Sequence, residues 1–311
     1  MRLSENIVWE ITHRCNLRCP FCFIPKRKNR NELSLHDISK CLSNAKKLGV
    51  QQITFSGGEV FLKANFVDIM SIVRDYEYHC NIFTNGTLLD KKIIKFFILP
   101  STKFIISLDG PKAIHEIIRG KNTWTKTINA IKLLSSMYVE FGIQLTLTPS
   151  NFNFLEWATD IAEKYGASWI QFCPVQKVNN FEKESEFIIS EQRTKEIYVN
   201  ILSLKRKIIN GIDIYIENLA TKDILIKEKE RFVSPIYTIK PDGLIFPYIG
   251  LDGHQWQIGT LLEPAYIDFE KRNRFRKQLS QVYKNCLKMA ETKGIVNFWD
   301  ELYHAVDANG K

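Results

Sequence analysis

The chain alternates six short apolar runs with longer amphipathic stretches over its first two thirds. The short runs are rich in β-branched and aromatic residues, whereas the longer stretches repeat apolar residues at helical spacing. Because parallel strands need a crossover between them, this alternation predicts a parallel sheet covered by helices, either as a barrel or doubly wound. The expected strands are residues 6–12, 51–57, 80–86, 103–110, 142–148 and 169–175, and the expected helices are residues 33–48, 65–77, 88–97, 123–138, 153–165 and 187–209.

The alternation stops near residue 210, and the remaining chain predicts a small α/β appendage. It contains a β-hairpin around Pro241-Asp242-Gly243, because these three residue types favour a tight turn. No low-complexity linker separates the two parts, so we expect them to pack tightly. The appendage is expected to add a short strand in residues 256–262 and helices near 266–290 and 296–306, and the expected domains are residues 1–210 and 211–311.

The chain carries 43 lysine and arginine residues against 34 aspartate and glutamate residues, a formal charge of +9. Such a balance suits an acidic peptide, a phosphorylated ligand or a nucleic acid. Two dense basic runs, KRKNR at 26–30 and KEKER at 227–231, have no aromatic residues interleaved for stacking on bases. We therefore interpret them as solvated surface and expect no nucleic-acid partner.

The N-terminal stretch lacks the charged-then-apolar pattern of a secretory signal, and no apolar run approaches the roughly 18 residues that span a bilayer. We expect a cytoplasmic protein without a membrane partner. The chain has seven cysteines, and this odd number argues against a disulfide framework.

Three of the seven cysteines, Cys15, Cys19 and Cys22, closely follow the first expected strand. Loops at this end of parallel strands form the active sites of α/β barrels. A structural zinc site normally takes four protein ligands, often from a second cysteine pair, and no such pair follows in the sequence. Three thiolates without a fourth suit a [4Fe–4S] cluster that leaves one iron open to another ligand.

With Phe21 before the last cysteine, this segment resembles the CxxxCxΦC motif of radical S-adenosylmethionine (SAM) enzymes, in which Φ is aromatic. The resemblance implies a partial (β/α)6 TIM-type barrel, a [4Fe–4S] cluster held by Cys15, Cys19 and Cys22, and SAM bound at the fourth iron. It further implies that SAM is reductively cleaved to a 5′-deoxyadenosyl radical, which abstracts a substrate hydrogen. An electron donor such as flavodoxin or ferredoxin is then an expected partner.

The ends of the next three expected strands carry residues similar to those of the same family. Gly57, Gly58 and Glu59 form a GGE motif, whose glycines allow a close backbone approach to a ligand and whose carboxylate suits a cationic amine. Taken alone, such a segment is more often a turn before a helix. The resemblance implies that Glu59 holds the SAM ammonium. The remaining cofactor-binding candidates are Phe21, Thr84 and Asn85, then Ser107 and Asp109 near the SAM ribose or the substrate, and Arg119 beside the SAM carboxylate.

The appendage is similar to the SPASM or twitch domains of one radical SAM subgroup, but it departs from their pattern at the cluster-binding positions. Tyr248 stands where that subgroup usually places a cysteine, and Cys286 is the only cysteine after residue 210. An auxiliary cluster needs about four ligands, so we expect one [4Fe–4S] cluster in the chain. Without a second cluster to accept an electron, a redox-neutral outcome such as epimerisation is favoured.

A redox-neutral outcome needs a hydrogen donor for the product radical, and a thiol can supply one. Cys173, at the end of the sixth expected strand, is the first candidate and Cys286 the second. The alternative for both is a small buried side chain without a chemical role. Asn151 and Asn153, beyond the fifth expected strand, are interpreted as caps of the helix that follows.

The substrate is expected to be a ribosomally made peptide, with a small molecule such as an aminoglycoside or sugar as the alternative. Many relatives with SPASM-type domains modify peptides, and a basic surface suits an acidic leader. Fourteen residues precede the cysteine loop, so we expect no leader-binding domain ahead of it. A metal-binding protein without catalytic activity is the alternative of another class.

Overall fold

The computed structural model describes residues 3–24, 31–98, 101–176, 186–207, 211–234, 236–251 and 253–309. The basic run at 26–30 lies outside these residues. Within the described residues, no helix has the length and apolar character needed to cross a membrane.

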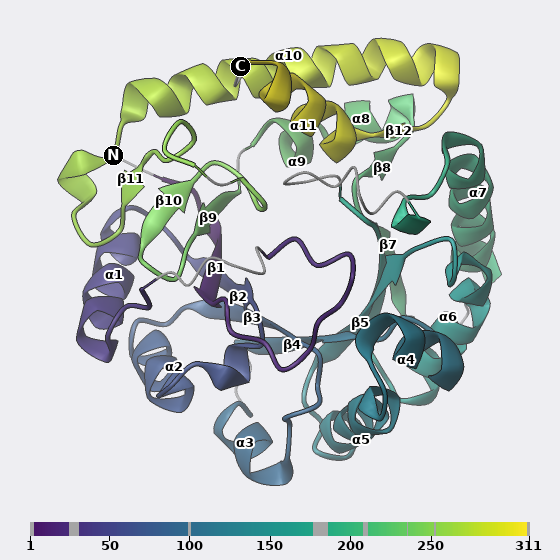
Figure 1. Cartoon of the computed structure of the whole chain (residues 1–311), viewed down its shortest axis with the longest axis horizontal. Coiled ribbons are helices and arrows are strands. Elements are labelled where there is room, and N and C mark those ends of the chain that lie inside the picture. The colour runs from purple at the N-terminus through teal and green to yellow at the C-terminus, as the bar shows by residue number, and fades with distance from the viewer. Residues whose placement is uncertain are drawn as a thin grey trace.

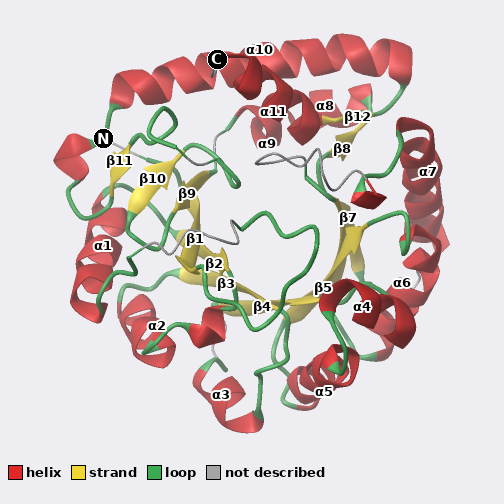
Figure 2. Ribbon diagram, in the orientation of Figure 1, coloured by secondary structure: helices red, strands yellow, loops and turns green. Residues whose placement is uncertain are grey.

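In the part of the chain that the structure describes, ten strands form one curved sheet. This sheet is the body of the molecule (Figures 1 and 2). Seven consecutive parallel strands lie in chain order, and β9, parallel to β1, extends the sheet beyond its first strand. The antiparallel strands β10 and β11 complete that edge. The strands are β1 (Asn6–Thr12), β2 (Gln52–Gly57), β3 (His79–Thr84), β4 (Thr102–Ser107), β5 (Phe141–Leu147), β6 (Trp169–Pro174), β7 (Asp213–Ile216), β9 (Tyr237–Ile239), β10 (Leu244–Phe246) and β11 (Gly259–Thr260).

Helices follow the parallel strands and cover the convex face of the sheet (Figure 2). The six helices expected in the first two thirds are confirmed, with ends that shift by a few residues. They are α1 (Leu35–Lys47), α2 (Phe66–Asp75), α3 (Lys91–Phe96), α5 (Thr123–Ser136), α6 (Leu155–Lys164) and α7 (Glu191–Lys207). An additional helix, α4 (Lys112–Arg119), was not expected, because its eight residues show too few turns for a clear helical period. The partial-barrel architecture is thus confirmed.

The two faces of the sheet differ in character. On β1, Ile7, Trp9 and Ile11 belong to the large core shared with the helices. The alternate residues Glu10 and Thr12 point to the concave face, since successive strand residues face opposite sides. The same alternation runs through the other parallel strands, so that the concave face is largely polar.

The C-terminal part of the chain closes the open side of this sheet (Figure 1). The hairpin expected around residues 241–243 is confirmed as β9 and β10. The long helix α10 (Phe269–Lys293) and α11 (Phe298–Asn309) are also as expected, and they enclose a second apolar cluster. The remaining elements are α8 (Lys222–Lys227), α9 (Lys229–Val233) and a small sheet of β8 (Leu219–Ala220) with β12 (Val296–Asn297).

The expected domain boundary at residue 210 falls just before β7, which pairs with β6. On the other edge, β9 pairs with β1. One hydrogen-bonded sheet therefore contains strands from both sides of the boundary, and the division into residues 1–210 and 211–311 stays a prediction.

Candidate active site

The loop that follows β1 carries Cys15, Cys19 and Cys22 at the C-terminal edge of the sheet. Cys19 is buried, Cys15 is half-buried and Cys22 reaches the surface. The Cys22 amide donates to the carbonyl of Cys19 (3.2 Å), and the Leu17 amide donates to the Cys15 sulfur (3.4 Å). The thiols lie on one short turn whose backbone is internally bonded.

The three thiols influence one another. Although Cys22 reaches the surface, the protein atoms packed around its sulfur shield it from water and raise its pKa to about 11, and the neighbouring thiols Cys19 and Cys15 add to the rise. Burial also raises the pKa of Cys15, as do Glu59 and Cys19 nearby. Within the described part of the chain, no three Cys, His, Asp or Glu side chains stand in position to hold a metal ion. The donor set nevertheless fits an iron–sulfur cluster by its chemistry, because such clusters are held by thiolates.

Gly57 and Gly58 pack against the backbone of the cysteine loop. A Cβ atom on Gly57 would lie 2.3 Å from the Thr12 carbonyl oxygen, and one on Gly58 would lie 2.1 Å from that of Arg14. The Gly58 amide donates to Thr12 (2.7 Å) and the Glu59 amide to Arg14 (2.8 Å). The contact that requires glycine in this structure is therefore with the protein's own loop, and a contact with a ligand stays a prediction.

Glu59 is completely buried and accepts three hydrogen bonds. The donors are the Thr84 hydroxyl (2.7 Å), the Asn85 amide (2.9 Å) and the Phe61 amide (3.4 Å). Burial raises the pKa of Glu59, and the hydrogen bonds from Thr84 and Asn85 oppose that rise. Among the described residues no cation contacts this carboxylate, so its charge is held by neutral donors and suits a cationic ligand.

Asn16, which the sequence did not single out, joins the cysteine loop to the turn after β3. The Asn16 side-chain amino group donates to the Thr87 hydroxyl (2.8 Å), and the Asn16 side-chain oxygen accepts from the Asn85 side chain (3.0 Å). The Thr127 hydroxyl donates to the Asn85 carbonyl (2.8 Å) and secures the turn from α5. The position of Asn16 directly after Cys15 was the only feature of the sequence that could have indicated this role.

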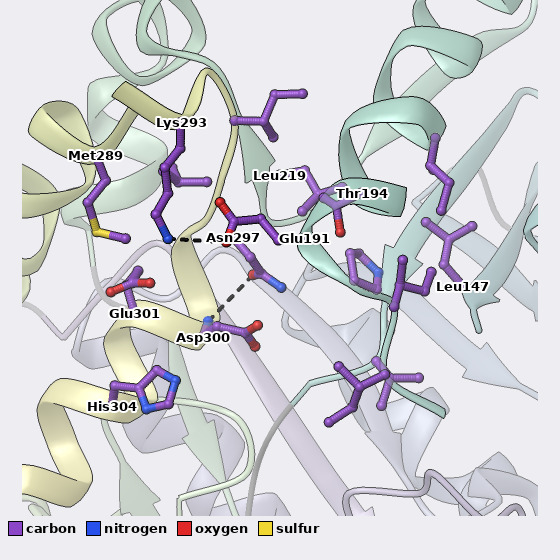
Figure 3. A pocket seen from close by; sticks show the side chains of 17 residues that line it. Leu147, Glu191, Thr194, Leu219, Met289, Lys293, Asn297, Asp300, Glu301 and His304 are labelled. Atoms are coloured by element: carbon purple, nitrogen blue, oxygen red, sulfur yellow. Dashed lines mark hydrogen bonds and ion pairs between the residues drawn. The ribbon is translucent and has the colours of Figure 1, made fainter. Parts of the chain in front are cut away.

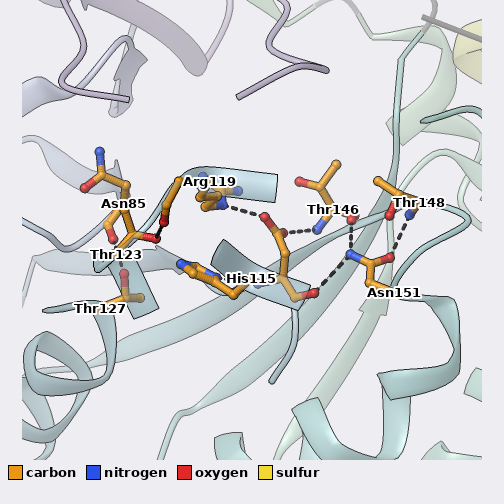
Figure 4. Close-up of polar contacts among 10 residues, drawn as sticks. Asn85, His115, Arg119, Thr123, Thr127, Thr146, Thr148 and Asn151 are labelled. Atoms are coloured by element: carbon orange, nitrogen blue, oxygen red, sulfur yellow. Dashed lines mark hydrogen bonds and ion pairs between the residues drawn. The ribbon is translucent and has the colours of Figure 1, made fainter. Parts of the chain in front are cut away.

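Asp109, just beyond β4, is completely buried and is the centre of a polar network. Figure 4 shows its neighbours Arg119, Thr146 and Asn151. One carboxylate oxygen accepts from Arg119 Nε (2.5 Å) and the other from the Thr146 amide (3.0 Å). The Asn151 side chain donates to the carbonyls of Asp109 (3.1 Å) and Thr146 (2.7 Å) and accepts from the Thr148 amide (2.7 Å). Asn151 stands at the N-cap position of the short helix Phe152–Phe154, as expected, but it makes no side-chain cap hydrogen bond because its side chain belongs to this network.

Arg119, at the end of α4, reaches back to the cysteine loop. Its side chain is almost fully buried, and although burial disfavours its charge, Asp109 and the Cys19 thiol raise the pKa of the guanidinium. His115, buried on the same helix, accepts from the Asp109 amide through Nδ1 (3.2 Å). Burial lowers the pKa of His115 to about 4, so its ring is neutral and leaves Arg119 as the cation beside Asp109.

The model of the Radical SAM superfamily matches residues 9–153, which contain the cysteine loop, Glu59, Asp109 and Arg119. The chain belongs to the radical SAM superfamily. Glu59 is buried beside the turn after β3, and Asp109 and Arg119 form one ion pair.

Several curated proteins are similar to parts of this radical SAM chain. An uncharacterized protein of Methanocaldococcus jannaschii is 29% identical over 54% of this chain and 62% of its own length. The Fe-coproporphyrin III synthase of Methanosarcina barkeri is 24% identical over 65% of this chain and 52% of its own length. A probable GTP 3′,8-cyclase of Methanococcus maripaludis is 27% identical over 72% of this chain and 71% of its own length. The chain thus spans about half to two thirds of the first two proteins.

Solved structures resemble the chain over nearly its whole length. The structure of anSMEcpe with bound AdoMet superimposes with a TM-score of 0.75 and 18% identity, covering 96% of this chain and 94% of that one. Streptococcus suis SuiB bound to the precursor peptide SuiA gives a TM-score of 0.75 and 16% identity, covering 89% and 67%. At these identities the likeness establishes the fold, including the C-terminal part.

The remaining predicted residues of this radical SAM protein lie in different surroundings. Phe21, half-buried in the cysteine loop, contacts Phe187 edge-on, with ring centroids 6.3 Å apart. Ser107 is half-buried at the end of β4. Cys173, half-buried on β6, receives a weak hydrogen bond from Asn218 (3.8 Å) and donates one to the Pro174 carbonyl (3.6 Å). Burial raises the pKa of Cys173 to about 12, so it carries its hydrogen at neutral pH.

Cys286 lies on α10 and is completely buried in the second apolar cluster. Burial raises the pKa of Cys286 to about 12. The thiol is enclosed by side chains of the C-terminal helices and does not face the concave side of the sheet. This burial favours a packing role, and the expected role of Cys286 as a second hydrogen donor stays a prediction.

A cavity of about 270 Å³ lies beside the ends of β5 and β6, between α7 and the C-terminal helices (Figure 3). Leu147 and Leu219 contribute to its apolar lining, and Glu191 pairs with Lys293 across it (3.3 Å). Glu191 and Glu301 lie in the first turns of α7 and α11, where a helix N-terminus stabilises negative charge.

A buried ionic network that sequence reasoning missed supports the start of the cysteine loop. Glu10 accepts from Lys240 Nζ (2.7 Å) and contacts His13 Nε2 (2.7 Å), and all three side chains are nearly inaccessible. Although burial would raise the pKa of Glu10, Lys240 and His13 hold it below its ordinary value. The network ties the hairpin of the C-terminal part to β1.

Lys240→Met is expected to lower the free energy of unfolding by about 3–5 kcal/mol, because it leaves the Glu10 carboxylate buried without its main cation. Urea unfolding of the reconstituted protein at neutral pH measures this. The stabilisation is present above the ordinary pKa of a glutamate and should fade as the pH falls through the lowered value. Lys222→Met, which removes an exposed pair with Glu291, is the control and should change stability little. Equal stability of both variants would contradict the prediction.

Proposed function

We propose that this radical SAM enzyme abstracts a hydrogen atom from a ribosomally made peptide, and that a protein thiol supplies a new hydrogen atom to the product radical, in a redox-neutral reaction such as epimerisation. The observation that carries the proposal is the meeting of three groups at one edge of the sheet. These are the cysteine loop, the buried Glu59 carboxylate and the Asp109–Arg119 ion pair. The first supplies thiolate ligands, the second an anion and the third a cation.

The cluster and SAM, when bound, supply a 5′-deoxyadenosyl radical. In the proposed arrangement Cys15, Cys19 and Cys22 hold the cluster, and Phe21 borders it. Glu59, oriented by Thr84 and Asn85, holds the methionine ammonium. Arg119, oriented by Asp109, holds the methionine carboxylate as a charge-assisted pair. Ser107 is proposed to contact substrate.

A single cluster and a redox-neutral outcome are supported by the C-terminal part. Tyr248 is buried against Phe275 and Trp299, with ring centroids 5.2 and 4.6 Å apart. Aromatic packing thus fills the position at which the related subgroup usually carries a cysteine. Cys286 lies within the same apolar cluster. The electron that starts each reaction is proposed to come from an external donor such as flavodoxin or ferredoxin.

The preference for a peptide is supported by structures of similar fold, one of SuiB with its precursor peptide and one of anSMEcpe with a bound peptide. The relatives named for porphyrin and GTP chemistry favour a small molecule as the second candidate. A metal-binding protein without catalytic activity is the remaining alternative.

Anaerobic reconstitution tests the proposal. The protein is expected to bind about four irons per chain, and to form 5′-deoxyadenosine when it is reduced in the presence of SAM. Stoichiometric zinc without SAM cleavage would favour the non-catalytic alternative. Genes adjacent to this one then distinguish the two substrate classes, since a short peptide reading frame and a sugar pathway predict different substrates.

Cys173→Ala is expected to abolish the incorporation of solvent deuterium into product, because the protonated thiol on the concave face is the proposed hydrogen donor. Mass spectrometry of product made in D₂O measures the incorporation. Cys286→Ala is the matched control, since its thiol is enclosed in the C-terminal cluster. Unchanged incorporation in Cys173→Ala would exclude this residue as the donor.

A further inference from the structure

Four polar side chains form one row across the concave face of the sheet. In the strand register, Ser107 of β4 stands opposite Gln144 of β5, Gln144 opposite Gln171 of β6, and Gln171 opposite Tyr215 of β7. Residues at matched positions in neighbouring parallel strands point to the same side of a sheet. The row therefore presents two hydroxyl and two carboxamide groups to the interior of the barrel.

The residues on either side of this row belong to the core beneath the helices. Ile143 and Leu145 flank Gln144, and Ile170 and Phe172 flank Gln171, all with no exposed surface. The row itself is half-buried at its first three positions and exposed at Tyr215. Bulky branched residues normally fill the interior of a parallel barrel. Here that space is lined by polar groups that solvent still reaches, which is how a ligand site differs from a packed core.

The row has unused hydrogen-bonding capacity and no charge. Gln171 Nε2 donates to Gln144 Oε1 (2.5 Å), which orients both carboxamides. Among the described residues, the Gln171 carbonyl oxygen, the Gln144 amino group and the Ser107 hydroxyl have no further partner, and none of them is sealed from solvent. The row thus offers both donors and acceptors. Burial of such groups without partners is costly, so a ligand that binds here must satisfy them.

The charged groups near the row already have partners. Asp213, two residues before Tyr215 on β7, accepts from the Tyr215 hydroxyl (3.3 Å). Glu217, two residues beyond Tyr215, bonds Arg231 (2.9 Å), and Lys103, towards the other end of β4, bonds Glu140 (2.7 Å). A charged ligand would find no opposite charge in the row itself. A neutral group with adjacent donor and acceptor atoms fits it better, and the peptide unit is the common group of this kind.

The row lies two residues before the proposed reaction site along strands β5 and β6. Thr146 and Cys173 stand opposite each other two residues further along the same strands, and Asp109 bonds the Thr146 amide. Two strand residues correspond to about 7 Å. A peptide backbone held by the row would accordingly place its next residue close to Cys173 and to the Asp109–Arg119 pair.

We infer that Ser107, Gln144, Gln171 and Tyr215 bind backbone amides of the substrate peptide and so position the residue that loses a hydrogen atom. This inference rests on the proposed function and adds to it the chemical class that the barrel interior recognises. Gln144 and Gln171 supply the paired hydrogen bonds, while the two hydroxyl groups border them.

The test uses N-acetyl-alanine N′-methylamide, deuterated on its alpha and beta carbons, with the reconstituted holoenzyme, SAM and a reductant. Abstraction breaks a carbon–deuterium bond of the probe and forms one at the 5′ carbon, so deuterated 5′-deoxyadenosine reports a probe bound beside the radical. We expect this transfer, and we expect Gln171→Met and Gln144→Met each to raise the probe concentration for half-maximal transfer about tenfold. Gln281→Met, on the exposed side of α10 and bonded only to Asn285, is the control and should match the wild type.

Other outcomes separate the inference from the proposed function. Normal 5′-deoxyadenosine formation without deuterium from the amide probe overturns the inference alone. Deuterium transfer only from deuterated N-acetylglucosamine, offered as a comparison probe, overturns the inference together with the peptide as proposed substrate, and favours the small-molecule candidate. Unchanged half-maximal concentrations in both glutamine variants overturn it as well. Absence of 5′-deoxyadenosine from the wild type overturns the proposed function and the inference together. If a methionine variant fails to bind iron, Gln171→Glu keeps the side-chain shape, and its new charge should abolish transfer from the neutral probe.

Discussion

Cys19→Ala is expected to abolish cluster binding and SAM cleavage together. Cys19 is the buried member of the three thiols, and it lies close enough to Arg119 to raise the pKa of that guanidinium. Two thiolates cannot replace the three that the proposed cluster needs, so iron should fall from about four atoms per chain to near zero. Iron and sulfide analysis after anaerobic reconstitution measures the first effect, and chromatography of 5′-deoxyadenosine measures the second.

Cys286→Ala is the matched control for this prediction, because it also removes a buried thiol. Its side chain lies in the C-terminal apolar cluster, away from the cysteine loop. This variant should keep its full iron content and its SAM cleavage, with a modest loss of stability from the small cavity. A Cys19→Ala protein that retains the iron content of Cys286→Ala would show that the cluster is held elsewhere.

Glu59→Gln is expected to weaken SAM binding by about 100-fold while the iron content stays unchanged. The substitution keeps the side-chain size and removes the charge that the structure buries beside Thr84 and Asn85. Loss of one partner from a buried charge pair costs about 3–5 kcal/mol, which corresponds to at least that change in affinity. Equilibrium dialysis of labelled SAM against the reconstituted protein measures it, with iron analysis as the parallel readout.

Glu291→Gln serves as the control for Glu59→Gln, since Glu291 lies on the exposed side of α10 and pairs only with Lys222. It should bind SAM as the wild type does. A Glu59→Gln protein with wild-type SAM affinity would contradict the proposed role of this carboxylate. A protein that loses both iron and SAM would instead assign Glu59 to the stability of the cysteine loop, through the hydrogen bond that joins the two segments.

The strands of the parallel sheet could be located from sequence because each is a short run rich in β-branched and aromatic residues, set between longer stretches with helical spacing. β1 begins and ends at the expected residues, and the five strands after it shift by no more than three residues at either end. β7 escaped prediction, since four residues between two helical stretches carry little pattern. Its membership in the main sheet depends on hydrogen bonds to β6, which are not encoded in local composition.

The candidate site was predictable in its residue types but only partly in its contacts. Cysteine spacing and the acidic residue after two glycines identify Cys15, Cys19, Cys22 and Glu59 directly from the chain. The sequence predicted that Gly57 and Gly58 approach a ligand, whereas the structure packs them against the backbone of the cysteine loop. The sequence does not say which backbone segment comes closest to a glycine. Lys240 was missed for the same reason, as 230 residues separate it from Glu10.

The sequence by itself determined the order of strands and helices, the three thiols on the first loop and the polar residues at the strand ends. These follow from local patterns, in which side-chain period and spacing are read along one segment. The tertiary structure decided which thiol faces the barrel interior, since Cys173 and Cys286 differ only in where their elements pack. It also decided that Ser107, Gln144, Gln171 and Tyr215 stand in one row. Register between strands is set by hydrogen bonds and core packing across the whole sheet, and a shift of one residue would turn these side chains into the core.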